Sequence, residues 1–187
     1  MTYSTVKDYL GDLKGLLDKL NPEDLLKIIE ILNDARKKNK TIFLIGNGGS
    51  AATANHFVCD FGKNAVKGDE NRFRVISLCD NSSCITAYGN DCGYDSVFIE
   101  QLKNLMQEGD IVLAISASGK SPNIVRAIQY AKKKNGVVIG LSGCDGGELA
   151  KLSDVSINIP AFCYEQIEDL HLVITHIIVY CFKKAQN

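Results

Sequence analysis

The sequence lacks the features that mark several classes of protein. It has no low-complexity stretch and no internal repeat. Its longest apolar runs fall far short of the roughly 20 residues that cross a bilayer, so we expect no membrane partner. The first residues carry acidic side chains without a long apolar core, unlike a secretory signal. The formal net charge is only −1, and bulk electrostatics therefore give no argument for a nucleic-acid partner.

Cysteine pairs are also missing. None of the seven cysteines belongs to a C-x-x-C motif, their number is odd, and no group of histidines accompanies them. This distribution argues against a disulfide framework and against a structural zinc site. We therefore expect reduced thiols in a cytoplasmic protein.

Two amphipathic helices are expected at the start of the chain. Apolar residues recur at helical spacing in segment 5–20. Asn21-Pro22-Glu23 then supplies a cap, a proline in the first helical position and an acidic first turn, and the second helix should run to about Lys38. Because the turn between them is short, residues 1–39 are predicted to form an antiparallel helical pair that packs against another copy of the chain.

After residue 40 the pattern changes to short apolar runs separated by helical stretches. A continuous apolar run suits a strand that is covered on both faces, and alternating strands and helices predict a parallel sheet. The expected fold class is α/β, a five-stranded parallel sheet flanked by helices in a flavodoxin- or Rossmann-like three-layer arrangement. Residues 1–187 should form one domain, with the α/β core at 40–187. The predicted strands are 41–45, 74–78, 111–115, 137–141 and 155–159.

Two polar loops follow the first and third of these strands. Ligands of open parallel sheets bind beyond the carboxyl ends of the strands, where Gly46–Ser50 and Ser116–Ser121 would lie. Ser121 precedes a proline and begins a helix, whose free N–H groups carry partial positive charge. With the other serine hydroxyls added, the second loop is suited to bind phosphate. The alternative is that Ser121 only caps its helix and the other serines fill a turn.

Two nucleotide-binding motifs compete with this interpretation. Segment 118–121 resembles the end of a Walker A loop, but Ala114 stands where that motif needs glycine. Segment 46–51 satisfies G-x-G-x-x-[GA] after a strand, and Asp80 could bind a ribose. The dinucleotide interpretation leaves the second, serine-rich loop unexplained.

Ionisable side chains recur at helical spacing in two segments. His56 and Asp60 are four residues apart and share one helix face. Glu168 and His176 are eight apart in the last helix and point roughly the same way, whereas His171 lies at a different azimuth. Both acids and both aligned histidines could meet at one cleft. The alternative is that the acid and the histidine on each helix form only a solvated pair. For His176 the alternative is a hydrogen-bonded residue of the core or of an interface.

The short segment Gly89-Asn90-Asp91 allows two interpretations as well. It could be a turn with a helix cap. It could equally supply polar contacts to a polyhydroxy ligand from the region after the second strand. The phosphate-binding character of the other loops favours the second interpretation.

Together these segments resemble the SIS (sugar isomerase) family over nearly the whole chain. The motifs GNGGSA, GND at 89–91, ISASGKSPN, LSGCDGG and the His-x4-His of the last helix follow one another in that family's order. The resemblance implies a five-stranded parallel sheet between helices, assembled as a homotetramer that the two leading helices help to build.

The resemblance also implies a reaction on a small-molecule sugar phosphate. This is the isomerisation of sedoheptulose 7-phosphate to glycero-manno-heptose 7-phosphate through an enediol(ate), for cell-surface polysaccharide precursors. The resemblance assigns the role of the base to Asp60 and the role of the acid to His176. Zinc, or another divalent metal ion, would be held by His56, Asp60, Glu168 and His176. The implied substrate contacts are Asn47, Gly48, Ser50, Asp91, Ser116, Ser118, Ser121 and Glu168.

The sequence departs from the family pattern at two of these positions. Asp60 is one methylene shorter than the family's Glu, and Glu168 replaces a Gln. The Arg that follows the base in many relatives has no match at its position, and Lys63, one residue earlier, is the candidate to replace it. These changes suit a subgroup with a related sugar-phosphate substrate. They also suit a non-catalytic module that binds phosphosugars or proteins, like the family member that associates with a replication initiator.

Overall fold

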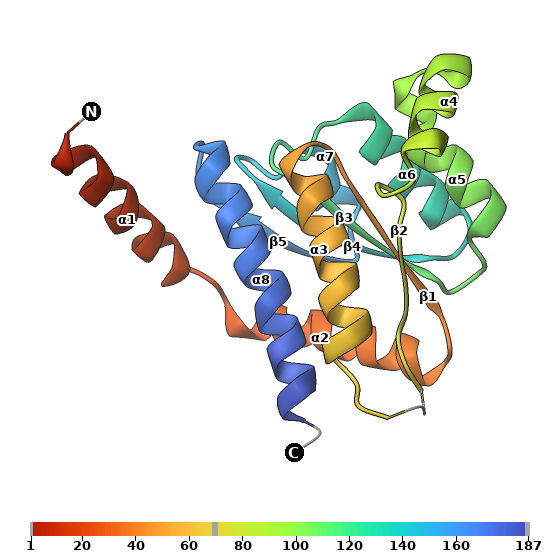
Figure 1. Cartoon of the computed structure of the whole chain (residues 1–187), viewed down its shortest axis with the longest axis horizontal. Coiled ribbons are helices and arrows are strands. Elements are labelled where there is room, and N and C mark those ends of the chain that lie inside the picture. The colour runs from red at the N-terminus through yellow and green to blue at the C-terminus, as the bar shows by residue number, and fades with distance from the viewer. Residues whose placement is uncertain (1, 69–70, 186–187) are drawn as a thin grey trace.

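Five parallel strands form a single sheet in the order β2-β1-β3-β4-β5 in the computed structural model, which describes residues 2–68 and 71–185 (Figure 1). The parallel sheet predicted from the apolar runs is therefore confirmed, and each strand begins where it was expected. The strands are β1 (Thr41–Gly46), β2 (Arg74–Ser77), β3 (Ile111–Ser116), β4 (Val137–Gly143) and β5 (Val155–Ile159).

Both faces of the sheet are covered, because alternate side chains of each central strand point to opposite sides. Ile42 and Leu44 of β1 belong to one buried apolar core, and Phe43 and Ile45 belong to the other. The first core lies under α2 (Pro22–Lys37), α3 (Gly49–Asn64) and α8 (Tyr164–Lys184). The second lies under α5 (Val97–Leu105), α6 (Pro122–Lys133) and α7 (Gly147–Leu152). The three-layer arrangement follows from this alternation.

A short helix and a single 3-10 turn precede α5. These are α4 (Ser82–Cys92) and η1 (Tyr94–Ser96). Figure 1 shows α4 at the end of the molecule where β1 and β3 lead into their helices. This segment therefore stands beside the two polar loops.

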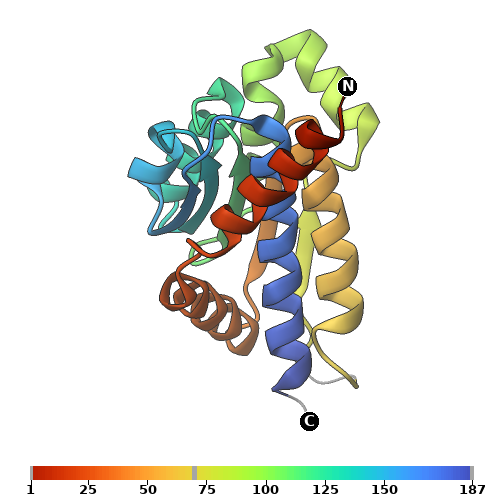
Figure 2. The same ribbon diagram turned by 90° about the vertical axis from the view of Figure 1, so that its left-hand side faces the viewer.

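The helix α1 (Tyr3–Leu17) does not form the antiparallel pair with α2 that the sequence suggested. It projects from the body of the molecule and crosses α8 instead (Figure 2), and the Tyr9 hydroxyl donates a 2.6 Å hydrogen bond to Asp169. The apolar side chains of Tyr3, Val6 and Leu10 are more than half exposed. A short linking turn limits the distance between two helices but does not fix the angle between them. Within the described residues, no helix is long and apolar enough to span a bilayer.

The strand order places the two polar loops side by side. After β1, the chain adds β2 on one side, whereas β3 lies on the other side of β1. This reversal is the switch point at which α/β sheets bind their ligands, beyond the carboxyl ends of the strands. The loops that follow β1 and β3 border this point.

Candidate active site

The glycine loop, residues 46–50, makes a tight turn from β1 into α3. Gly48 precedes the helix with a φ of +54°, a conformation that glycine adopts at little cost. A Cβ on Gly46 would lie 2.7 Å from the backbone carbonyl of Ser50. The chain can therefore pass this closely only with glycine at position 46, and Ser50 is brought into the first turn of α3.

The serine loop, residues 116–121, leads from β3 into α6. The hydroxyls of Ser116 and Ser118 accept hydrogen bonds from the backbone N–H groups of Gly119 and Lys120, both at 3.2 Å. Ser121 occupies the N-cap position of α6, but its hydroxyl makes no capping hydrogen bond. The expectation that Ser121 merely caps its helix is therefore wrong, and this hydroxyl is available to a ligand.

The two loops line one small pocket of about 130 Å³. This volume corresponds to roughly four water molecules at about 30 Å³ each. Serine hydroxyls and the start of a helix give the pocket the character of an anion site. Of the residues expected to bind substrate, six line it together, and Tyr164 adds a contact that the sequence did not indicate. The full lining is Asn47, Ser50, Ile115, Ser116, Ala117, Ser118, Ser121, Tyr164 and Glu168.

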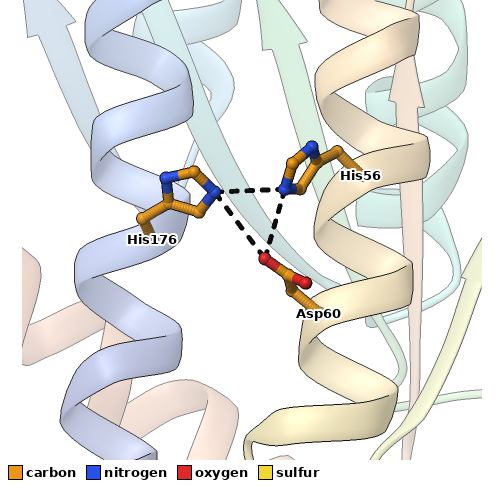
Figure 3. A group of neighbouring side chains, drawn as sticks. All are labelled: His56, Asp60 and His176. Atoms are coloured by element: carbon orange, nitrogen blue, oxygen red, sulfur yellow. Dashed lines mark hydrogen bonds and ion pairs between the residues drawn. The ribbon is translucent and has the colours of Figure 1, made fainter.

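Beside the pocket, two histidines and an aspartate converge between α3 and α8 (Figure 3). The Nε2 atoms of His56 and His176 are 3.1 Å apart and lie 3.2 and 3.6 Å from Oδ2 of Asp60. The side chains are 48%, 48% and 27% exposed for His56, His176 and Asp60. The second oxygen of Asp60 accepts a 3.3 Å hydrogen bond from Asn64. Three of the four side chains whose helix spacing suggested a common site therefore lie together, and this cluster is open to solvent.

The donor set of this cluster fits a zinc ion. Ligand atoms about 2.0–2.1 Å from a tetrahedral zinc lie roughly 3.3 Å from one another, close to the three observed separations. Two imidazoles and one carboxylate are common zinc ligands, and three protein ligands leave the fourth position open, as in catalytic sites. No ligand atom would have to move far to hold the ion.

Glu168 does not belong to this cluster. Among the described residues, the group whose ligand atoms lie within 4.8 Å of one another contains only His56, Asp60 and His176. The carboxylate of Glu168 lies in the pocket instead, against the first turn of α3, where a Cβ on Gly49 would be 2.1 Å from its Oε2. The structure thus brings together three of the four expected metal ligands and places the fourth with the serines. Helix spacing gave the direction of Glu168, but not the contact that holds it.

His171 faces the protein interior, as its different azimuth predicted. It is fully buried, and its Nε2 lies 3.1 Å from the carbonyl oxygen of Ser142 at the end of β4. Burial lowers the pKa of His171 to about 4, so the ring is neutral near pH 7 and Nε2–H is the donor. Nδ1 has no hydrogen-bond partner among the described residues. His171 is therefore a structural residue.

The segment Gly89-Asn90-Asp91 lies in the last turn of α4 rather than in a loop. Asp91 is exposed and accepts a 2.7 Å hydrogen bond from Asn90, and it does not line the pocket. Gly48 does not line the pocket either and acts through the backbone conformation of its loop. The expected contact of Asp91 with the sugar therefore stays a prediction.

Comparison with known proteins identifies the family to which the chain belongs. The SIS domain family model matches residues 8–143, and the chain belongs to this family. The match favours a phosphosugar over a dinucleotide as the ligand of the glycine loop.

Individual relatives show which members of the SIS family the chain is similar to. The chain is 38% identical over 180 residues to the phosphoheptose isomerase of Sulfurimonas denitrificans, covering 96% of this chain and 89% of that protein. It is 40% identical over 145 residues to the phosphoheptose isomerase of a Nitratiruptor species, covering 78% and 77%. Among solved structures, the phosphoheptose isomerase GmhA from Neisseria gonorrhoeae superimposes with a TM-score of 0.89 at 29% identity, covering 97% and 98% of the two chains.

Proposed function

We propose that this protein is an aldose–ketose isomerase that converts sedoheptulose 7-phosphate into D-glycero-D-manno-heptose 7-phosphate. Two relatives that match nearly its whole length, those of Sulfurimonas denitrificans and Neisseria gonorrhoeae, are phosphoheptose isomerases. The chain also retains an acid and a histidine, Asp60 and His176, beside a pocket suited to phosphate. The product would serve as a precursor of heptose in cell-surface polysaccharides.

One observation carries the proposal: the pocket and the histidine–aspartate cluster are built on the same two helices. In α3, Ser50 lines the pocket and His56 belongs to the cluster. In α8, Glu168 lines the pocket and His176 belongs to the cluster. At 1.5 Å per residue the two places are roughly 9–12 Å apart along the helices. A seven-carbon chain with its phosphate at one end and its carbonyl at the other spans a comparable distance.

The reaction moves a proton between C1 and C2, so it needs a base at carbon and a proton donor at oxygen. In the proposed mechanism the carboxylate of Asp60 removes the proton from carbon and returns it to the neighbouring carbon. His176 supplies and withdraws the proton at the adjacent oxygen. The serine hydroxyls and the start of α6 hold the phosphate, and Asn47 and Glu168 contact the polar groups of the sugar chain.

A divalent metal ion, most simply zinc, is part of the proposal. His56, Asp60 and His176 would hold it, and when bound it would polarise the sugar carbonyl and favour the enediolate. Oδ2 of Asp60 and Nε2 of His176 are the atoms that would bind the ion. An atom that binds the ion cannot carry the transferred proton at the same time, so metal binding and proton transfer at these two atoms are alternative uses of the cluster. Asp60 is one methylene shorter than the usual Glu, and a displacement near 1 Å can change the rate about 100-fold.

The proposed assembly is a homotetramer in the cytoplasm. The exposed apolar face of α1 is the surface that other copies would cover. All seven cysteines are free, which suits a reducing compartment.

The decisive experiment incubates purified protein with sedoheptulose 7-phosphate, with and without added zinc, and follows the sugar by NMR. We expect conversion to the heptose 7-phosphate. Binding without conversion under both conditions would favour a non-catalytic phosphosugar-binding module. Conversion of a different ketose phosphate in preference would assign the protein to another sugar-phosphate isomerase.

A further inference from the structure

The amide of Asn47 is held by three hydrogen bonds at the rim of the pocket. Its Oδ1 accepts from the hydroxyl of Tyr94 and from Nδ2 of Asn123, both at 2.9 Å. Its Nδ2 donates to Oδ1 of Asn123 at 3.0 Å. An amide oxygen has two lone pairs and an NH₂ group has two donors, so one N–H of Asn47 remains without a partner.

A backbone group fixes which way these two amides face. Oδ1 of Asn123 also accepts a 2.9 Å hydrogen bond from the backbone N–H of Ile124, which can only donate. If the Asn123 amide were turned over, its NH₂ would face this N–H in a place where only 2% of the residue is exposed. The orientation of Asn123 is therefore set by the backbone of α6. Its amide in turn sets the orientation of Asn47, because the reversed Asn47 would bring oxygen against oxygen and NH₂ against NH₂.

We infer that Asn123 is a positioning residue, which makes Asn47 present an N–H donor and no acceptor to the pocket. The inference rests on the proposed function only for the nature of the ligand, a phosphorylated sugar. The ligand atom that faces Asn47 is then an acceptor oxygen, either of the phosphate group or of the sugar chain next to it. A hydroxyl that must donate at this place is disfavoured.

The pairing also connects the two halves of the site. Asn47 belongs to the glycine loop after β1, and Asn123 lies in the first turn of α6, directly after the serine loop. The hydrogen bonds between them join these two loops across the switch point of the sheet. A donor that is oriented before the ligand arrives costs no reorganisation when the ligand binds.

The experiment replaces Asn123 by its isostere in Asn123→Asp. The carboxylate still accepts from the Ile124 N–H, but it cannot donate to Oδ1 of Asn47. We expect kcat/KM for sedoheptulose 7-phosphate to fall about tenfold, the equivalent of one hydrogen bond. Asn104→Asp makes the same chemical change on α5, outside the pocket lining, and should leave kcat/KM unchanged. Thermal unfolding followed by circular dichroism verifies that each variant folds.

A double-variant cycle with Asn47→Ala distinguishes positioning from general damage. If Asn123 acts through Asn47, Asn123→Asp should add no further loss once Asn47 is alanine. An equal loss in both backgrounds would overturn the inference. Should Asn123→Asp not fold, Tyr94→Phe removes the other donor to the same oxygen and should give a smaller loss that also disappears in the Asn47→Ala background.

An NMR readout keeps this inference separate from the proposed activity. The side-chain NH₂ signals of Asn47, identified by their absence in Asn47→Ala, should be inequivalent and slowly exchanging in the unliganded protein. The N–H that donates to Oδ1 of Asn123 should lose this protection in Asn123→Ala, which removes the acceptor, and should keep it in Asn123→Asp. If the protein shows no turnover but these signals behave as expected, the proposed function fails and the positioning role stands. If the protection is unchanged in Asn123→Ala, the positioning role fails.

Discussion

Asp60 and His176 are the residues on which the proposed proton transfer depends. We expect Asp60→Asn and His176→Gln each to lower kcat by about 10²–10⁴-fold, the usual contribution of a general base or acid. Both side chains are partly exposed, so the melting temperature should change little. Asp34→Asn, on the exposed side of α2, removes the same charge away from the site and is the matched control. Normal turnover by His176→Gln would show that another group is the acid.

His171 gives a prediction about stability and pH. Its folded-state pKa of about 4 lies below the usual 6.5, so between these values the unfolded state binds more protons than the folded state. The contribution of neutral His171 to the free energy of unfolding is fully present above about pH 6.5. It is lost as the pH falls toward 4, and the total loss is about 3 kcal/mol. His171→Gln retains a donor for Ser142 but does not titrate. Urea unfolding across this range should show a weaker pH dependence for His171→Gln than for the parent protein, and identical slopes would refute the assignment.

Glu168 is a residue whose helix face could be predicted from the sequence but whose contacts could not. Its position two turns before His176 correctly placed it on the face of α8 that meets α3. Spacing alone could not distinguish a carboxylate that joins the two histidines from one that lies against Gly49. That distinction depends on side-chain torsions and on the approach of the two helices, which periodicity does not encode.

At the scale of elements, the serine loop depends on close backbone packing. Gly119 has a φ of +63°, and a Cβ at this position would be 2.0 Å from the carbonyl oxygen of Gly146. The N–H of Leu149 in α7 also donates to the Gly119 carbonyl at 3.0 Å. The loops after β3 and β4 therefore support each other through glycine contacts.

Gly119→Ala should displace the serine loop. We expect a loss of about 1–3 kcal/mol in unfolding free energy, typical of a strained backbone, together with weaker binding of inorganic phosphate. Gly89→Ala lies within α4, where an added Cβ would meet only Val97 at an ordinary 3.8 Å, and its unfolding free energy should not decrease. Urea unfolding and phosphate calorimetry measure the two effects. Unimpaired phosphate binding by a folded Gly119→Ala would argue against the serine loop as the anion site.

At the scale of the whole molecule, α1 is a helix whose apolar face the single chain leaves largely exposed. Its residues Tyr3, Val6 and Leu10 are 85%, 62% and 59% exposed on a helix that contacts the body mainly through α8. An apolar face of this kind is typical of an association surface. The predicted helix is confirmed and its role in association stays a prediction, whereas the divergence of α1 from α2 was not predicted.

The combined substitution Val6→Asp and Leu10→Asp should convert the proposed tetramer into smaller species. Charges on an apolar interface lose their hydration on association, whereas they cost little on an exposed helix. Light scattering after size-exclusion chromatography gives the mass. Asp8→Lys, two residues from both positions and therefore on another face of the helix, is the control. A parent protein that is already monomeric would contradict the assembly, and an unchanged mass of the double variant would contradict the role of α1.

The sequence by itself determined the strands, the helices and the order in which the polar loops occur, because hydrophobic periodicity and glycine or proline signals are local properties of the chain. It also indicated which faces of two helices carry His56, Asp60 and His176, since a regular helix fixes the relative direction of residues four apart, but the meeting of the two helices is a tertiary contact. Only the tertiary structure decided that Glu168 joins the serines, that Asp91 lies outside the pocket and that Asn123 orients Asn47. Each of these depends on contacts between residues far apart in the chain, whose geometry is set when helices and loops pack together on the sheet.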